Sequence, residues 1–222
     1  MIRSIAPLAA FTWCGLTAGA LAAPQVYTIE PGHTYPSFMA GHQGISHWTG
    51  KFNKSSGKVW LDREHSTGKI DITIDVSSIN FGFPMLDNIM QGPDYFDAAK
   101  YPTATYKSDS ITFMNGQPAA VNGQLTLRGV TKPVVLNLTA FKCRQNPMFN
   151  REVCGGDATG EFDRAQFGLT KAVEAGDSMV KLIIQVEAVQ GDSLPPMPKM
   201  PPMGAPGSPP PGAPAGPPPT SP

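Results

Sequence analysis

The strongest constraint on the fold is a stretch of strict two-residue alternation between positions 121 and 140. One side is apolar or lacks a side chain and the other is polar, as Val121, Gly123, Leu125 and Leu127 alternate with Asn122, Gln124, Thr126 and Arg128. The apolar face resumes at Val134, Leu136, Leu138 and Ala140. A period of two is that of a β-strand. Gly129 tolerates the positive φ of a reversal, and we expect Pro133 to restrict where the returning strand begins to pair. The stretch predicts a β-hairpin whose apolar face must be covered.

The same alternation recurs along the chain. It is cleanest at Lys69–Val76, where four aliphatic side chains share one face and exclude a helix, and it returns at Ser178–Val189. Further strands are predicted at Val26–Glu30, Pro36–His42, Trp48–Lys54, from Val59 and Leu61 onward, Thr103–Lys107, Ile111–Asn115 and Ala158–Asp163. Many short antiparallel strands predict an all-β sandwich or barrel. Closure removes exposed sheet edges, so we expect a barrel of about eight strands.

The segment Ser77–Tyr101 breaks this pattern. Its apolar residues have no period of two, and Gly92-Pro93 interrupts them. We predict a short helix near Met85–Gln91 and a second turn near Asp94–Ala98. Together they would form an apolar lid over one mouth of the barrel, from Phe81 to Phe96.

Both ends of the chain differ from this domain. Residues 1–22 resemble a secretory signal, with Arg3, an apolar run from Ile5 to Leu21 and small residues at Ala20-Leu21-Ala22. We expect cleavage before Ala23; the competing interpretation is a membrane anchor. Residues 191–222 are rich in proline and nearly uncharged. Such a segment buries too little surface to fold, so we predict a disordered tail. The folded domain is therefore expected at residues 23–190.

Charge and cysteine content narrow the function. The 17 basic and 17 acidic side chains cancel, which argues against recruitment of nucleic acid or of an anionic membrane surface. Cys143 and Cys154 are the two cysteines of the expected mature chain. Exported proteins usually pair an even number of cysteines, so we expect a disulfide. A catalytic or metal-binding thiol pair is the alternative, but the spacing matches no zinc pattern.

Reactive constellations are sparse. The sequence does not exclude a metal site built from His42 and His47 with Asp62 or Glu64. We nevertheless expect no metal, since a lone inward histidine is more often structural. Gly44-Ile45-Ser46-His47-Trp48 lacks the final glycine of a nucleophile elbow. No phosphate-binding glycine loop is found. We therefore predict no catalytic residues.

At the hairpin the sequence resembles a known family. Residues 123–134, Gly-Gln-Leu-Thr-Leu-Arg-Gly-Val-Thr-Lys-Pro-Val, are similar to the signature of the YceI-like family, periplasmic proteins with a lipocalin-like barrel. Other matching pieces occur in the expected order: residues 27–34, Phe38 with His42, residues 50–52, Ser56-Gly57, and residues 94–97, 101–106 and 163–169. The resemblance extends over about residues 25–190.

The resemblance implies lipid binding rather than catalysis. Members of the family hold a polyisoprenoid such as a quinone or a prenyl phosphate, and no other cofactor is expected. We predict that thirteen apolar side chains line such a cavity, although each could simply fill the core. They are Phe38, Phe52, Ile72, Ile74, Phe81, Phe83, Leu86, Phe96, Tyr106, Leu125, Leu136, Phe167 and Ile184.

One departure from the family bears on the ligand. Members commonly carry a His-Leu-Arg run ahead of the position of Asp94, where this chain has Ile89, Met90 and Gln91. The loss of an imidazole and a cation favours a neutral, quinone-like ligand over a prenyl phosphate.

The leading hypothesis is thus a periplasmic, non-catalytic carrier of an isoprenoid-type lipid. A second hypothesis is an envelope interaction module with a filled barrel that acts through its Pro-rich tail. A third is an enzyme that uses His42 or His47. The sequence leaves open a homodimer and an envelope partner for the tail.

Overall fold

The computed structural model describes residues 24–171, 173 and 177–196. The predicted signal segment and the tail from residue 197 onward lie outside these described residues. In the described part of the chain, no helix is long and apolar enough to span a bilayer. The elements are β1 (Gln25–Ile29), η1 (Pro31–His33), β2 (Tyr35–His42), β3 (Ser46–Phe52), β4 (Ser55–Asp62), β5 (Thr67–Asp75), η2 (Val76–Ser78), β6 (Ile79–Asn80), α1 (Pro84–Gln91), β7 (Thr103–Met114), β8 (Gln117–Leu127), β9 (Val130–Asn146), β10 (Arg151–Asp163), η3 (Arg164–Phe167) and β11 (Met179–Gln190).

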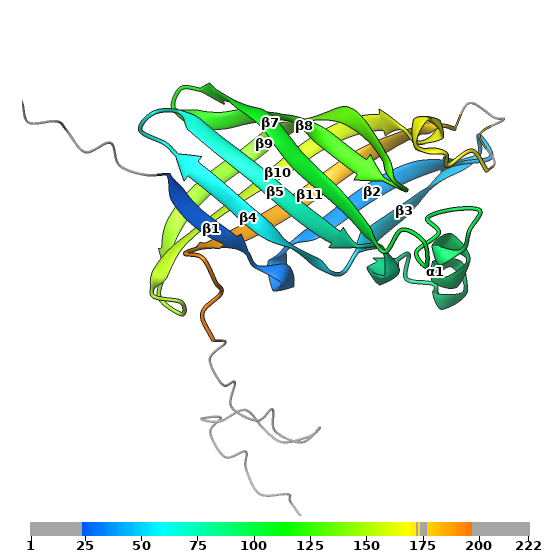
Figure 1. The fold of residues 1–222 in the computed structure, drawn as a ribbon, viewed down its shortest axis with the longest axis horizontal. Helices are drawn as coiled ribbons and strands as arrows, with labels where there is room; N and C mark the ends of the chain where they lie inside the picture. The colour runs from blue at the N-terminus through cyan, green and yellow to red at the C-terminus, as the bar shows by residue number, and fades with distance from the viewer. Residues whose placement is uncertain (1–23, 172, 174–176, 197–222) are drawn as a thin grey trace, which may run out of the picture.

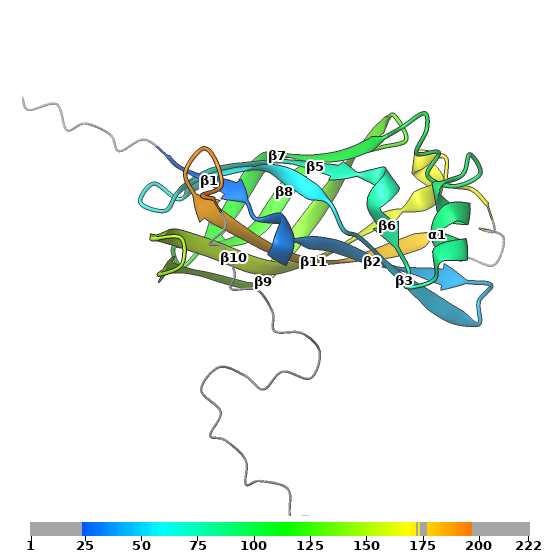
Figure 2. The same cartoon turned by 90° about the horizontal axis from the view of Figure 1, so that it is seen from below.

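The predicted all-β barrel is confirmed. Eight strands form a closed antiparallel ring in the order β1-β4-β5-β7-β8-β9-β10-β11, with β11 pairing back onto β1 (Figure 1). The remaining strands, β2, β3 and β6, continue the sheet outward from β11. Helix α1 lies at one end of the elongated barrel, as both views show (Figure 2). The predicted short helix is therefore present, and it lies at an end of the barrel as a lid would.

Strand β11 closes the ring because two strands pair with different parts of the same edge of β11. Its first half, Val180–Gln185, pairs with β2, and its end, Ala188–Gln190, pairs with β1. The chain must therefore break between β1 and β2, and it does so through the 3-10 turn η1.

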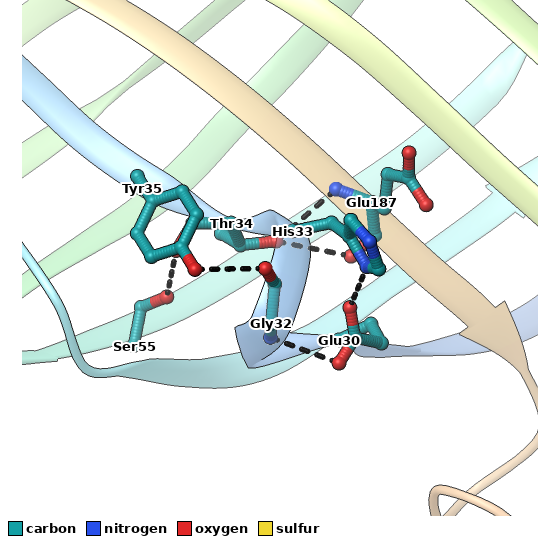
Figure 3. Close-up of polar contacts among 7 residues, drawn as sticks. All are labelled: Glu30, Gly32, His33, Thr34, Tyr35, Ser55 and Glu187. Carbon is teal, nitrogen blue, oxygen red and sulfur yellow. Dashed lines mark hydrogen bonds and ion pairs between the residues drawn. The ribbon is translucent and has the colours of Figure 1, made fainter. Parts of the chain in front are cut away.

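Polar contacts hold this break (Figure 3). The buried carboxylate of Glu30 accepts hydrogen bonds from the Gly32 amide at 2.8 Å and from the His33 ring. The Thr34 hydroxyl donates to the Glu187 carbonyl and accepts from the Glu187 amide. The Ser55 hydroxyl donates to the Thr34 carbonyl. Side chains thus replace the ladder hydrogen bonds that a continuous strand would have made.

The hairpin predicted from the alternation between positions 121 and 140 joins β8 to β9. Arg128 and Gly129 form its two-residue loop with φ of 50° and 74°, as a primed turn requires. The expectation for Pro133 is wrong, because pairing already begins at Val130 and Pro133 lies opposite Gln124. In this register the Pro133 nitrogen points away from β8. The described pairs between β9 and β10 begin only at Asn137, so no ladder bond is lost there.

Two other predicted boundaries change. Thr103–Lys107 and Ile111–Asn115 belong to a single strand, β7, whose register shifts between Ser108 and Ser110. This β-bulge inserts one residue and interrupts the sequence alternation without ending the strand. Ala158–Asp163 is only the final part of β10.

The predicted disulfide is confirmed. Cys143 of β9 and Cys154 of β10 lie directly opposite each other and are bonded, with a sequence separation of 11. Next to them the buried Tyr27 hydroxyl donates to Glu152, which also accepts from Arg63 at 2.8 Å. Burial, with the Glu152 carboxylate, raises the pKa of Tyr27 to about 12, so its hydroxyl stays protonated and donates.

We expect the double substitution Cys143→Ala with Cys154→Ala to lower the free energy of unfolding by about 3 kcal/mol, because the unfolded chain loses a loop constraint. Urea unfolding of the oxidised protein and of the variant measures the difference. Reduction of the wild-type protein should give a similar loss, and an unchanged midpoint in both experiments would contradict the prediction.

The Glu30–His33 contact should make stability depend on pH. The hydrogen bond to Glu30 raises the pKa of His33 in the folded state above its unfolded value. The stabilisation is therefore complete below the unfolded pKa of about 6.5 and is lost as the pH rises through the higher folded pKa. Because the His33 side chain is 68% exposed, the effect is small. The difference in unfolding free energy between the wild type and His33→Gln should shrink from about pH 5 to about pH 9; a difference that grew with pH would refute this assignment.

Candidate functional site

Two apolar cavities lie inside the barrel. The first has a volume of about 270 Å³ and reaches Leu86 and Met90 of α1, so it lies at the lid end. The second has a volume of about 160 Å³ and reaches Tyr27, Phe141 and Cys154 at the disulfide end. Both are bounded by inward-facing residues of the alternating strands, because successive side chains of a strand point to opposite faces. The alternation that predicts the barrel therefore also makes its interior apolar.

Helix α1 covers the first cavity. Pro84 occupies its first turn, where the absent amide hydrogen costs nothing. Leu86 and Met90, four residues apart, line the cavity, whereas Met85 and Ile89 are exposed. The helix is thus apolar both toward the cavity and toward solvent.

Polar contacts attach the lid to the barrel rim. The Asp87 carboxylate accepts from the Phe81 amide at 2.7 Å. Arg128, from the β8–β9 loop, donates to the carbonyls of Pro93 and Tyr95. Lys171 forms an ion pair with Asp94 at 3.4 Å. The Asp87–Phe81 bond lies within the lid, whereas Arg128 and Lys171 come from two separate segments outside it, so the lid is held to the rim at two points.

An aromatic cluster forms the wall beneath the lid. The Phe38 ring contacts the rings of Phe52, Phe81 and Phe96 at centroid distances of 5.8, 5.7 and 6.2 Å. A Cβ atom at Gly50 would lie 2.7 Å from the Phe38 ring and 2.8 Å from the Phe81 ring. Glycine is therefore required at position 50 for these rings to pack against β3.

Eleven of the thirteen predicted lining residues bound one of the two cavities, and their contact with a ligand stays a prediction. Six of them bound the first cavity alone: Phe38, Phe52, Phe81, Leu86, Phe96 and Leu125. Ile72 bounds the second alone. Ile74, Tyr106, Leu136 and Ile184 bound both.

Phe83 and Phe167 border neither cavity, and their contact with a ligand stays a prediction. Phe83 precedes α1 and is 46% exposed. Phe167 is fully buried in η3, where its ring packs against Phe162 at 5.2 Å, but it reaches neither cavity. Phe83 is the extended residue that precedes α1 and Phe167 lies in the 3-10 turn η3, so neither belongs to a strand whose alternation would indicate an inward direction.

Sequence reasoning missed several lining residues. Trp48, Met90, Tyr95, Phe162, Leu169, Val180 and Leu182 bound the first cavity. Val180 and Leu182 share the predicted apolar face of β11 with Ile184, so the alternation could have found them. Tyr95 and Leu169 lie in connections without period, and only the folded structure places them.

The charged groups at the first cavity already have partners. Arg164 donates to the carbonyls of Leu169 and Lys171 at 2.9 and 2.8 Å, and Lys171 pairs with Asp94. His42 also borders the cavity, and its ring contacts that of Trp48. The mouth therefore offers mainly aromatic and aliphatic surface.

The structure does not assemble the metal site considered from the sequence. His42 and His47 lie in the β2–β3 hairpin at the lid end, while Asp62 and Glu64 lie at the β4–β5 turn at the opposite end (Figure 1). Within the described residues, the set of three potential ligands that comes together is Cys143, Glu152 and Cys154, and its two sulfurs form the disulfide.

The aromatic cluster yields a test of the fold. We expect Phe38→Ala to lower the free energy of unfolding by about 3 to 5 kcal/mol, because it removes a buried ring from contact with three others. The exposed Phe83→Ala is the matched control and should change it by less than about 0.5 kcal/mol. Chemical denaturation of both variants measures the contrast, and similar losses at the two positions would contradict this packing.

Comparisons with known proteins agree on one family. The YceI-like domain profile matches residues 27–188. Protein YceI of Salmonella agona is 30% identical over 187 residues, which is 82% of this chain and 97% of the relative. The YceI protein of Campylobacter jejuni, a solved structure, superposes with a TM-score of 0.60 at 26% identity and covers 68% of this chain and 90% of its own. A polyisoprenoid-binding domain from Saccharophagus degradans shares the fold, with a TM-score of 0.54 at 18% identity, over 74% of this chain and 98% of its own. The chain therefore belongs to the YceI-like domain family.

Proposed function

We propose that this chain is an exported, non-catalytic carrier that holds an isoprenoid-type lipid with a neutral, quinone-like head group inside its barrel. The observation that carries the proposal is the apolar cavity beneath α1, with its aromatic wall and its second chamber deeper in the barrel. An eight-stranded barrel has room for one small ligand. Apolar walls with few polar groups suit a hydrocarbon.

The mouth favours a neutral head group. The cations that border the first cavity are Arg164 and Lys171, and both already bond to carbonyl or carboxylate oxygens. The Asp94 carboxylate already offsets the charge of Lys171, which weakens the attraction of this mouth for a phosphate. A quinone ring needs only a flat apolar surface, which Trp48, Phe81 and Tyr95 supply.

The relatives support a lipid as the ligand. The Saccharophagus degradans domain, which shares the fold, is described as polyisoprenoid-binding. The apolar interior described above is compatible with the same class of ligand. Export to the periplasm rests on the N-terminal signal segment of the sequence, which lies outside the described residues.

The hydrogen bonds of the polar side chains support the proposal that the protein binds its ligand without catalysing a reaction. In the described part of the chain, no buried side-chain nitrogen or oxygen lacks a hydrogen-bond partner. The carboxylates near the lid, Asp87 and Asp94, bond to the backbone and to Lys171. A catalytic group would need to be directed at a ligand atom in the cavity.

Lid variants provide the test. We expect organic extracts of the freshly purified protein to contain an isoprenoid lipid by mass spectrometry. Leu86→Asp should lower its molar ratio to protein at least about 10-fold, because a carboxylate in an apolar cavity is strongly disfavoured.

Met85→Asp is the control, since it introduces the same charge one residue away on the exposed side of α1. The wild type and this control should carry equal amounts of lipid. Extracts free of lipid, with no uptake of an added isoprenoid quinone, would contradict the proposed function.

A further inference from the structure

The two cavities share one set of lining side chains, which we call the constriction. Five side chains border both of them, from four of the ring strands and from β2: Pro36, Ile74, Tyr106, Leu136 and Ile184. Tyr106 is the largest of them and is 93% buried, since its exposed fraction is 7%. A molecule that enters beneath α1 must therefore pass Tyr106 to reach the disulfide end.

Tyr106 is fixed against the barrel wall. It stands on β7 opposite Leu125 of β8. Its hydroxyl donates to the carbonyls of Val121, on β8, and Val134, on β9, at 3.0 and 2.9 Å. Burial raises the pKa of this phenol, so the hydroxyl keeps the proton with which it donates. The ring is thus held along the wall by strands on either side of its tip.

Gly123 provides the space for this arrangement. A Cβ atom at Gly123 would lie 2.8 Å from the Tyr106 hydroxyl and from the ring carbon that bears it. It would also lie 2.6 Å from the Lys107 carbonyl. A side chain at position 123 would therefore displace the phenol from its place on the wall and press on the backbone of β7.

The volumes of the two cavities indicate how much of a ligand can lie on each side of the constriction. The first cavity, about 270 Å³, falls just below the roughly 300 to 1,000 Å³ of most ligand sites. The second, about 160 Å³, is close to the roughly 150 Å³ apolar cavity that holds one benzene. It can therefore hold a hydrocarbon segment about as large as a single isoprene unit. Chain beyond that segment finds no further space.

We propose that Tyr106, held against the wall over Gly123, is the residue that determines which isoprenoid chain lengths the barrel accepts. This rests on the proposed function and extends it. The head group and first units occupy the cavity beneath α1, the chain passes the Tyr106 phenol, and its end fills the second cavity. Chains too short to pass Tyr106 lose the contacts of the second cavity.

The test is the dependence of affinity on chain length. Quinones with one shared head group and an increasing number of isoprene units are titrated into delipidated mature protein, and quenching of tryptophan fluorescence is followed, since Trp48 borders the first cavity. For the wild type, affinity should rise with length until the second cavity is filled and then fall, because further units find no space in the barrel.

Two variants should narrow the constriction. Gly123→Ala displaces the phenol, and Leu136→Phe adds bulk at another side chain that borders both cavities. The second variant keeps the test valid where the first fails to fold. In each, the ratio of long-chain to short-chain affinity should fall at least about 10-fold, or about 1.4 kcal/mol. Val135→Phe, on the outer face of the same strand and 45% exposed, is the control and should keep the wild-type ratio.

The outcomes separate this inference from the function on which it rests. Wild-type affinity that does not depend on chain length, or an unchanged ratio in the folded constriction variants, would overturn the role of Tyr106 alone. Absence of binding of every chain to the wild type would overturn the proposed function as well.

Discussion

Closure of the sheet through β11 is the constraint on which the rest of the structure depends. One edge of this strand must serve both β1 and β2, so the chain breaks at Glu30–Thr34, and its side chains take over the lost ladder bonds. Beyond the break, β2 leads away from the ring into β3 and β6. The sheet is therefore closed at the disulfide end and extended at the other. The extended end is where the interior needs a cover, and α1 supplies it.

The lid reconciles two demands on one short helix. Its inner side must match an apolar interior, and its edges must stay attached to a polar rim. Leu86 and Met90 meet the first demand, while the contacts of Asp94 with Lys171 and of the Pro93 carbonyl with Arg128 meet the second. Phe81 and Phe96 add ring contacts with Phe38 to this attachment, so the lid is held by apolar as well as polar contacts.

The sequence predicts the strands and much of the interior, because alternation and inward direction have the same physical origin. Ile72, Ile74, Leu125, Leu136 and Ile184 are inward for the reason that made them strand residues. The predicted strand boundaries are wrong where the period changes, because a bulge near Asp109 interrupts the alternation of β7 and two strands were predicted where the chain has one. Phe83 and Phe167, which border neither cavity, lie just before α1 and in η3, where no alternation indicates an inward direction. Contacts between segments that are distant in the sequence could not be predicted either. No pattern near Tyr106 indicates that its hydroxyl reaches β9, since this depends on the register of three strands and on a glycine 17 positions later.

Stability and ligand binding are linked in such a barrel through its volume. Strand number and stagger fix the diameter of a closed ring, so the wall cannot contract around a cavity as a helical core can. A dry cavity of about 270 Å³ would cost about 6 kcal/mol at roughly 24 cal/mol per Å³, a large share of a typical total stability of about 5 to 15 kcal/mol. An apolar occupant restores the missing contacts and stabilises only the folded state. The barrel wall, which is stabilised by its paired strands, the disulfide and the aromatic cluster, therefore also keeps this interior volume from collapsing. It maintains an interior that is stabilised most when it contains a hydrocarbon.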